Sequence, residues 1–251
     1  AATSGGAWSN GESPRFEPIA GTAGPTTITI SGTVTTGFGA VRFNGPGYTI
    51  TGGTLDTDGT WFYMNAPATV NSQLKTLMVY YDSELTIGGG GTLNNRAVIG
   101  GSNVNSVVRQ TGGDLSVVGD YMMIGGNTNH FGNARGHYII DGGTLTVDNG
   151  IYFGWKAATD YGTLTQNGGT VTVNGQGLQL GIAGGHGTYH LNGGTVNAHI
   201  RTTNNPASQT FNFGGGTFVH NATGATSTSA NMVTTIADGA TAYIDAGSHN
   251  L

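Results

Sequence analysis

One stretch of the sequence gathers most of the side chains that could take part in acid–base chemistry. It contains His130, Arg135, His137, Asp141, Lys156 and Asp160, with Arg109 and Asp114 about one repeat earlier. Glycosidases use a pair of carboxylates, and polysaccharide lyases use a base with Lys or Arg neighbours. If the chain is an enzyme, its candidate catalytic residues are therefore His137, Asp141, Lys156 and Asp160. Asp141→Ala or His137→Ala would then abolish activity and leave the fold intact.

The composition excludes several other classes of function. Of the 251 residues 47 are glycine, and only 8% are charged, against roughly 25% in ordinary proteins. Eight Lys and Arg against 13 Asp and Glu give a net charge of −5, which excludes a nucleic-acid partner. There is no cysteine, so disulfides and thiolate metal sites are excluded as well. No apolar run approaches the roughly 18–20 residues of a membrane-spanning helix, and we expect no membrane insertion of this segment.

Cofactor and metal motifs are also missing. The glycine run from Gly88 to Gly91 lacks the Lys-Ser/Thr pair of a phosphate-binding loop. His186 and His190 are four residues apart, and we expect strand alternation and a glycine corner to separate their side chains. We therefore expect no cofactor and no metal site.

The elements that must position these side chains repeat along the chain. A Gly-Gly-x-hydrophobic unit recurs with the glycine pairs Gly112-Gly113, Gly142-Gly143, Gly168-Gly169, Gly193-Gly194 and Gly215-Gly216, and earlier with Gly52-Gly53 and Gly90-Gly91. From Thr92 to Thr217 the third positions of these units are separated by 22 to 30 residues. A repeat of this length with variable insertions is typical of a solenoid.

Polar and apolar residues alternate with a period of two on both sides of each glycine pair. Before the pair, the inward positions are Val108/Gln110, Tyr138/Ile140, Leu164/Gln166, Tyr189/Leu191 and Phe211/Phe213. After the pair, alternation resumes in segments such as Leu115/Val117 and Leu145/Val147, and a third apolar segment follows, for example Met122 to Ile124. Such alternation is typical of half-buried strands, so each turn supplies about three short strands.

The fold class that follows is all-β, a single-stranded parallel β-helix (β-solenoid). Glycine suits its corners, because a tight bend needs positive φ or the absence of a side chain. We expect about eight turns, a length near 40 Å from the spacing between parallel strands, and a right-handed coil. Residues 26–220 form the predicted solenoid, residues 1–25 an N-terminal cap or tether, and residues 221–251 C-terminal strands that continue the solenoid or contact a neighbour.

Several segments of the sequence resemble bacterial autotransporter-associated β-strand repeat proteins. They are Trp8 to Gly11, Gly47 to Leu55, Gly187 to Thr195, Phe211 to Thr217 and Gly239 to Asp245. The resemblance implies an exported passenger or surface protein that reaches the cell surface through a C-terminal β-barrel or a sorting anchor. The sequence carries neither, so we expect a fragment, a processed product or a free secreted subunit.

The sequence as a whole predicts a non-enzymatic structural or adhesive β-solenoid, located outside the cell or on a bacterial cell surface. Its expected partners are further copies of itself, stacked head to tail into a filament, and surface glycans. Six aromatic residues outside the clearest inward positions could present rings to glycans, namely Trp61, Phe62, Tyr80, Tyr81, Tyr121 and Trp155. The alternatives are a carbohydrate-active β-helix (polysaccharide lyase or glycosidase) and a glycan-binding adhesin.

Overall fold

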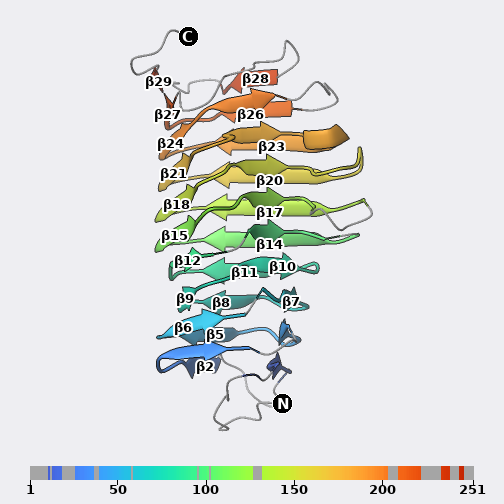
Figure 1. Ribbon diagram of the computed structural model, residues 1–251, viewed down its shortest axis with the longest axis vertical. Helices are drawn as coiled ribbons and strands as arrows, with labels where there is room; N and C mark the ends of the chain where they lie inside the picture. The colour runs from blue at the N-terminus through green and yellow to red at the C-terminus, as the bar shows by residue number, and fades with distance from the viewer. Residues whose placement is uncertain are drawn as a thin grey trace.

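A computed structural model of the chain shows a stack of parallel β-strands. It describes residues 11, 13–18, 26–36, 40–57, 59–94, 96–101, 103–126, 132–202, 209–221, 233–237 and 243–245. Within these ranges the strands form three sheets in stacked layers (Figure 1), and the only helix is the short 3-10 element η1 (Ile182–Gly184). The chain is thus an all-β parallel β-helix with three short strands per turn, as predicted from the repeat.

Each sheet takes one strand from each turn. Sheet A contains, in spatial order, β1 (Arg15–Phe16), β4 (Val41–Phe43), β7 (Phe62–Met64), β10 (Met78–Tyr80), β13 (Ala97–Ile99), β16 (Met122–Ile124), β19 (Ile151–Phe153), β22 (Leu178–Leu180) and β25 (Ile200–Thr202). Sheet B contains β2 (Thr26–Thr29), β5 (Tyr48–Thr51), β8 (Ala68–Val70), β11 (Glu84–Ile87), β14 (Asn105–Gln110), β17 (Arg135–Ile140), β20 (Tyr161–Gln166), β23 (His186–Leu191), β26 (Gln209–Phe213) and β28 (Val233–Ile236). Sheet C contains β3 (Thr33–Thr35), β6 (Thr54–Asp56), β9 (Gln73–Leu74), β12 (Gly91–Leu93), β15 (Asp114–Val117), β18 (Thr144–Val147), β21 (Thr170–Val173), β24 (Thr195–Ala198), β27 (Thr217–His220) and β29 (Tyr243–Asp245).

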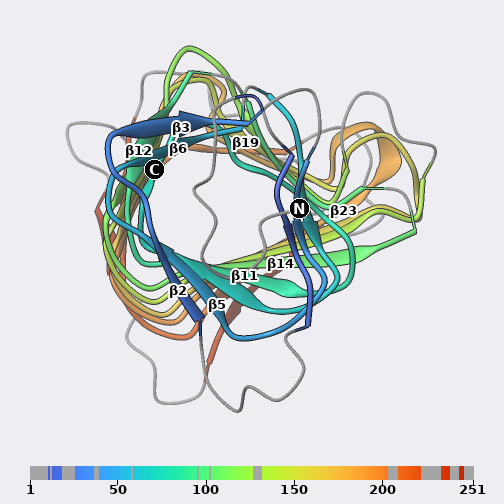
Figure 2. The ribbon, with the colours of Figure 1, turned by 90° about the horizontal axis from the view of Figure 1, so that it is seen from below.

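Among the described residues, every strand between the two ends of the stack pairs in parallel with the strands one turn before and after it. Residues 26–220 hold eight complete turns, β4 to β27, preceded by β2 and β3. Viewed along the stack, successive turns superimpose into a ring of three walls (Figure 2). In the flanking segments, β1 pairs with β4, β28 with β26, and β29 with β27, so their described parts extend the three sheets.

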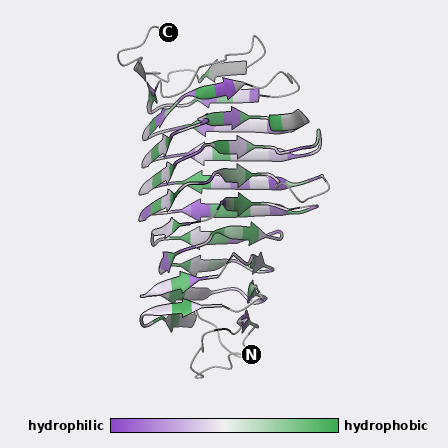
Figure 3. Ribbon diagram, in the orientation of Figure 1, coloured by the Kyte–Doolittle hydropathy of each residue, from purple (hydrophilic) through white to green (hydrophobic). Residues whose placement is uncertain are grey.

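The interior is one continuous hydrophobic core. The predicted inward residues of sheet B, from Val108 to Phe213, are at most 3% exposed, and the inward residues of β15, β18 and β21 are fully buried. Hydrophobic colour recurs in the strands of successive layers (Figure 3). Stacking is required because no single turn could bury its own apolar face.

The outer face of sheet A departs from simple alternation. The strands β13, β16 and β19 are buried at every residue. Their outward residues Val98, Met123 and Tyr152 form a second hydrophobic cluster, and Tyr121 and Trp155 pack against it. The apolar runs of the third segment are therefore explained by burial on both sides of the sheet.

The glycine pairs form the corner between sheets B and C. The second glycines of the pairs, Gly113, Gly143, Gly169, Gly194 and Gly216, all have positive φ between 71° and 84°. The carbonyls of the first four, Gly113 to Gly194, accept hydrogen bonds from the next turn, for example from the N–H of Thr144 to Gly113 (2.9 Å). The repeated glycines thus shape the corner and join consecutive turns.

Candidate functional site

The four candidate catalytic residues are spread along the length of the strands of sheet B. His137 lies on β17, and Asp141 directly follows the end of that strand. Lys156 and Asp160 lie in the loop before the start of β20. Because β17 and β20 are parallel and in register, the end of β17 and the start of β20 lie at opposite ends of the paired strands. Asp141 is therefore a strand length away from Lys156 and Asp160, and the structure does not bring the four side chains to one point. His130 lies outside the described residues.

Asp160 is a buried carboxylate that holds two loops together. The residue is 0% exposed. Its Oδ1 accepts a hydrogen bond from the backbone N–H of Ala134 (3.0 Å), and its Oδ2 accepts one from the N–H of Ala157 (2.9 Å). Lys156, by contrast, is exposed and has φ of 91°. In this position Asp160 stabilises the loops between sheets A and B and is not available to a ligand at the surface.

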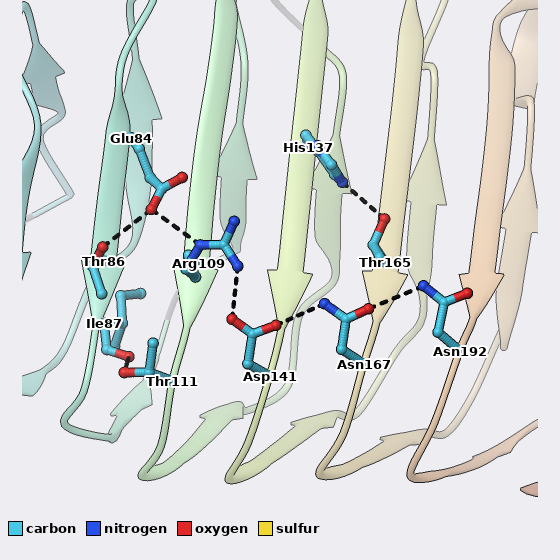
Figure 4. Close-up of polar contacts among 10 residues, drawn as sticks. All are labelled: Glu84, Thr86, Ile87, Arg109, Thr111, His137, Asp141, Thr165, Asn167 and Asn192. Carbon is cyan, nitrogen blue, oxygen red and sulfur yellow. Dashed lines mark hydrogen bonds and ion pairs between the residues drawn. The ribbon is translucent and has the colours of Figure 1, made fainter. Parts of the chain in front are cut away.

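Arg109 is the centre of a polar network on the outer face of sheet B (Figure 4). Its Nε donates to Oε1 of Glu84 (3.1 Å), and its Nη1 donates to Oδ2 of Asp141 (2.7 Å). Burial opposes ionisation of Asp141, but hydrogen bonds from Asn167 and Arg109 and the Arg109 charge hold its pKa below the usual range. The three charged side chains are about one-third exposed, so each ion pair contributes at most about 1 kcal/mol.

A ladder of amide side chains continues from Asp141 along the corner. Asn167 donates to Oδ1 of Asp141 (2.7 Å), and Asn192 donates to Oδ1 of Asn167 (3.0 Å), so one polar side chain per turn is linked to the next (Figure 4). Asp141 thus has two hydrogen-bonding partners on its two sides. Its role in this structure is to link neighbouring turns.

His137 is half-buried between the outward residues of β14 and β20. Its Nε2 forms a hydrogen bond with the hydroxyl of Thr165 (2.9 Å). Partial burial lowers the pKa of His137, the positive charges of His190 and Arg109 lower it further, and Glu84 opposes the shift. At neutral pH the ring is therefore neutral, as a general base would be, but no carboxylate hydrogen-bonds to it among the contacts of the described residues.

A first aromatic group, formed by Trp61, Tyr63, Tyr80 and Tyr81, lies on sheet A near β7 and β10. Ring centroids of neighbouring members are 4.9–5.9 Å apart, and the Arg42 guanidinium lies 4.3 Å from the centroid of Tyr63. All four rings are partly exposed. Phe62, which the sequence suggested as a ring that could contact glycans, instead points into the core and is fully buried.

A second aromatic group, formed by Tyr121, Tyr152 and Trp155, lies further along sheet A. Its rings are stacked, with centroids 4.9 and 5.3 Å apart. Arg96 lies 5.4 Å from the centroid of Tyr121 and pairs with Asp120 (3.7 Å). The two groups give sheet A an outer surface with aromatic rings and cations, which suits contact with an amphipathic partner.

A groove of about 270 Å³ lies on the outer face of sheet B, and we call it the Arg135 groove. Its lining includes Asn105, Arg135, His137, Tyr161 and Thr163. Arg135 lies opposite Tyr161 in the strand register, and Tyr161 lies opposite His186. This column of side chains was not predicted from the sequence, although its spacings of 26 and 25 residues match the repeat and were the signal for it.

Metal binding and membrane spanning find no support in the described ranges. No group of three or more His, Cys, Asp or Glu side chains there is placed to hold a metal ion. No helix in the same part of the chain is long and apolar enough to cross a membrane. His186 and His190 both lie outward on β23, so the expectation that alternation separates their side chains is wrong.

Comparison with known proteins does not assign this chain to a family. No protein-family model, curated protein or solved structure matches the chain. The proposed function therefore rests on the surfaces described above.

His199 is the most deeply buried of the described histidines. It is 0% exposed, its Nδ1 donates to Oδ1 of Asn221 (3.4 Å), and its Nε2 has no hydrogen-bond partner within the described part of the chain. Burial lowers its pKa, and the hydrogen bond to Asn221 only partly opposes that shift. Protonation would place an unpaired N–H and a positive charge in the protein interior.

We expect the free energy of unfolding to decrease as the pH falls below about 6.5. Burial lowers the folded-state pKa of His137, His190 and His199, so the unfolded chain binds more protons in this range. This contribution to stability is complete above the unfolded pKa and is lost as the pH falls through the folded values. The slope reaches up to about 1.4 kcal/mol per pH unit for each histidine.

Urea denaturation at pH 7.5, 6.5 and 5.5 measures this slope. His199→Gln, which cannot titrate, should show a shallower dependence than the unmodified chain. Equal slopes for the two proteins would contradict a destabilising protonation of His199.

Proposed function

We propose that this chain is a non-catalytic, extracellular structural and adhesive β-solenoid, a stiff surface element of the autotransporter-repeat type. The observation that carries the proposal is the continuity of the stack. Parallel strand ladders, one hydrophobic core and outward side-chain ladders such as Asp141–Asn167–Asn192 connect every turn to the next. Stability in such a repeat is the sum of the contacts within turns and between neighbouring turns, so each inner turn is stabilised by the turns on both sides of it.

The adhesive part of the proposal rests on the outer faces of the sheets. Partly exposed aromatic rings and arginines lie together on sheet A, and the Arg135 groove lies on sheet B. The alternative of a polysaccharide lyase or glycosidase gains no support from the placement of His137, Asp141, Lys156 and Asp160, because these residues are separated and Asp160 is enclosed.

Self-assembly into a filament is the structural part of the proposal. In the described part of the chain, β1, β2 and β3 pair on one side only, and so do β25, β28 and β29 at the other end. Parallel strand addition between these two edges would extend all three sheets, and such a heterologous contact repeats without closing.

Thr27→Pro tests this contact without disturbing the fold of one protomer. The N–H groups of Thr26 and Ile30 bond to β5, so alternation directs the N–H of Thr27 toward the free edge. Proline at position 27 removes that donor, and we expect assembly to be lost, whereas Thr27→Val should assemble as the unmodified chain does. Light scattering and negative-stain electron microscopy across a dilution series measure the outcome. A concentration-independent mass near 25.5 kDa for the unmodified chain would rule the filament out.

A further inference from the structure

The Arg135 groove combines a cation, a neutral imidazole and uncharged hydrogen-bonding groups on consecutive turns. Asn105 lies on β14, Arg135 and His137 on β17, and Tyr161 and Thr163 on β20. Because neighbouring turns are about 4.8 Å apart, the groove crosses the strands and runs along the stack. This direction suits a linear ligand that meets one group after another.

Arg135 is the cation of this groove. Its side chain is exposed, and the ion pairs among the described residues involve Arg96 and Arg109 but not Arg135. On the outer face of sheet B, Glu84 and Asp141 are both engaged by Arg109. Asp160, which directly precedes Tyr161, is buried and accepts hydrogen bonds from the backbone N–H groups of Ala134 and Ala157. The guanidinium of Arg135 therefore retains its capacity for an anionic ligand.

A stack of rings holds Arg135 in place. Its guanidinium lies 4.5 Å from the centroid of Tyr161, whose other neighbour, His186, is parallel to it at 4.3 Å and an interplanar angle of 7°. Nε2 of His186 donates to the carbonyl oxygen of Ala158 (2.8 Å), which fixes the far side of the stack. Tyr161 thus supports the guanidinium, and a side chain that is ordered before binding loses less entropy when a ligand arrives.

The chemistry of the groove selects its ligand. A guanidinium binds a carboxylate through two parallel hydrogen bonds, and Thr163 and Asn105 can exchange hydrogen bonds with hydroxyl groups. At the far end Asp82 accepts a hydrogen bond from the N–H of Asn105 (2.5 Å), so that end disfavours a second negative charge. A polyuronate satisfies this pattern, because hydroxyl groups separate its carboxylates. A polyphosphate has more closely spaced charges and no such hydroxyls, so a protein of net charge −5 repels it more strongly.

We propose that the Arg135 groove binds a carboxylated polysaccharide, a chain of uronic acid residues whose carboxylate pairs with Arg135. The inference rests on the adhesive part of the proposed function and gives it a ligand class and a site. Arg135 is the specificity-determining residue, and Tyr161 and His186 are positioning residues.

Calorimetric titration of the full chain with polygalacturonate tests the proposal, with dextran as a neutral polysaccharide. We expect binding to polygalacturonate alone, at least tenfold weaker in Arg135→Gln and weakened to a smaller degree in Tyr161→Leu. Lys75→Gln is the control for charge, because it removes one cation from an exposed position that directly follows β9 of sheet C. Arg42→Gln reports on the first aromatic group of sheet A, where Arg42 covers a tyrosine ring at 4.3 Å. Thermal unfolding of each variant verifies that the fold is intact.

Three results would overturn the inference. The first is no binding of polygalacturonate, and the second is equal affinity in Arg135→Gln and the unmodified chain. The third is a loss of affinity in Arg42→Gln and not in Arg135→Gln, which would assign binding to the first aromatic group. Binding of inorganic polyphosphate but not polygalacturonate would likewise replace the uronate ligand with a phosphate. Light scattering of the same samples reports assembly separately, so failure of the filament and failure of the groove are distinguishable.

Discussion

Gly143→Ala is expected to destabilise the solenoid by about 3 kcal/mol or more, because two penalties coincide at this position. Gly143 has φ of 80°, a conformation that costs an L-residue roughly 1–2 kcal/mol. A Cβ atom there would lie 2.1 Å from the carbonyl oxygen of Gly113 on the preceding turn. That carbonyl cannot move away freely, since it accepts the hydrogen bond from the N–H of Thr144.

Gly119→Ala is the matched control for this prediction. Gly119 has φ of 70°, but nothing lies within 4 Å of an added Cβ atom. The control should therefore lose only the conformational part, roughly 1–2 kcal/mol. Urea denaturation of both variants measures the difference, and equal losses would show that contact between stacked glycines does not constrain the corner.

Tyr138→Phe is expected to destabilise the protein by about 1–3 kcal/mol although it removes a single oxygen atom. The Tyr138 hydroxyl donates to Oε1 of Gln110 on the preceding turn (2.7 Å), and both residues are fully buried. Burial raises the pKa of Tyr138 far above its usual value, so the hydroxyl remains a donor at all working pH values. Without it, the Gln110 oxygen would be buried with no partner.

A double-mutant cycle separates this hydrogen bond from packing. The amide of Gln110 donates to the carbonyl oxygens of Gly113 (3.1 Å) and Thr144 (2.9 Å), so Gln110→Leu has its own cost at the corner. After Gln110→Leu, the further change Tyr138→Phe should cost little or even stabilise, since no acceptor is left for the hydroxyl. Additive losses in the cycle would contradict the coupling. The same arrangement recurs at Tyr189 and Gln166 (2.6 Å), and Tyr189→Phe should lose a similar amount.

The polar pairs in the core show where sequence patterning stops being informative. Alternation placed Gln110 and Gln166 at inward positions, and the structure confirms that both are fully buried. Their partners Tyr138 and Tyr189 are 28 and 23 residues away. Whether a side chain points inward follows from its position along one strand. Which side chain it hydrogen-bonds to depends on the register between turns, and the register cannot be read from the sequence because loop lengths vary.

The sequence by itself determined the fold class of this protein. Period-two alternation on both sides of a repeated Gly-Gly corner allows few structures, because each turn exposes an apolar face that a neighbouring turn of the same pattern must cover. Three strands per turn and about eight turns in residues 26–220 follow from that pattern, and both agree with the structure.

Only the tertiary structure decided what the surface can do. Stacking in register placed Arg135, Tyr161 and His186 in one column. It also placed Asp141 and Lys156 at opposite ends of the strands of sheet B. It also enclosed Asp160, which the sequence had suggested as a candidate catalytic carboxylate. The physical reason is that side chains on neighbouring turns come within contact distance only through the register, and the register depends on how each loop closes.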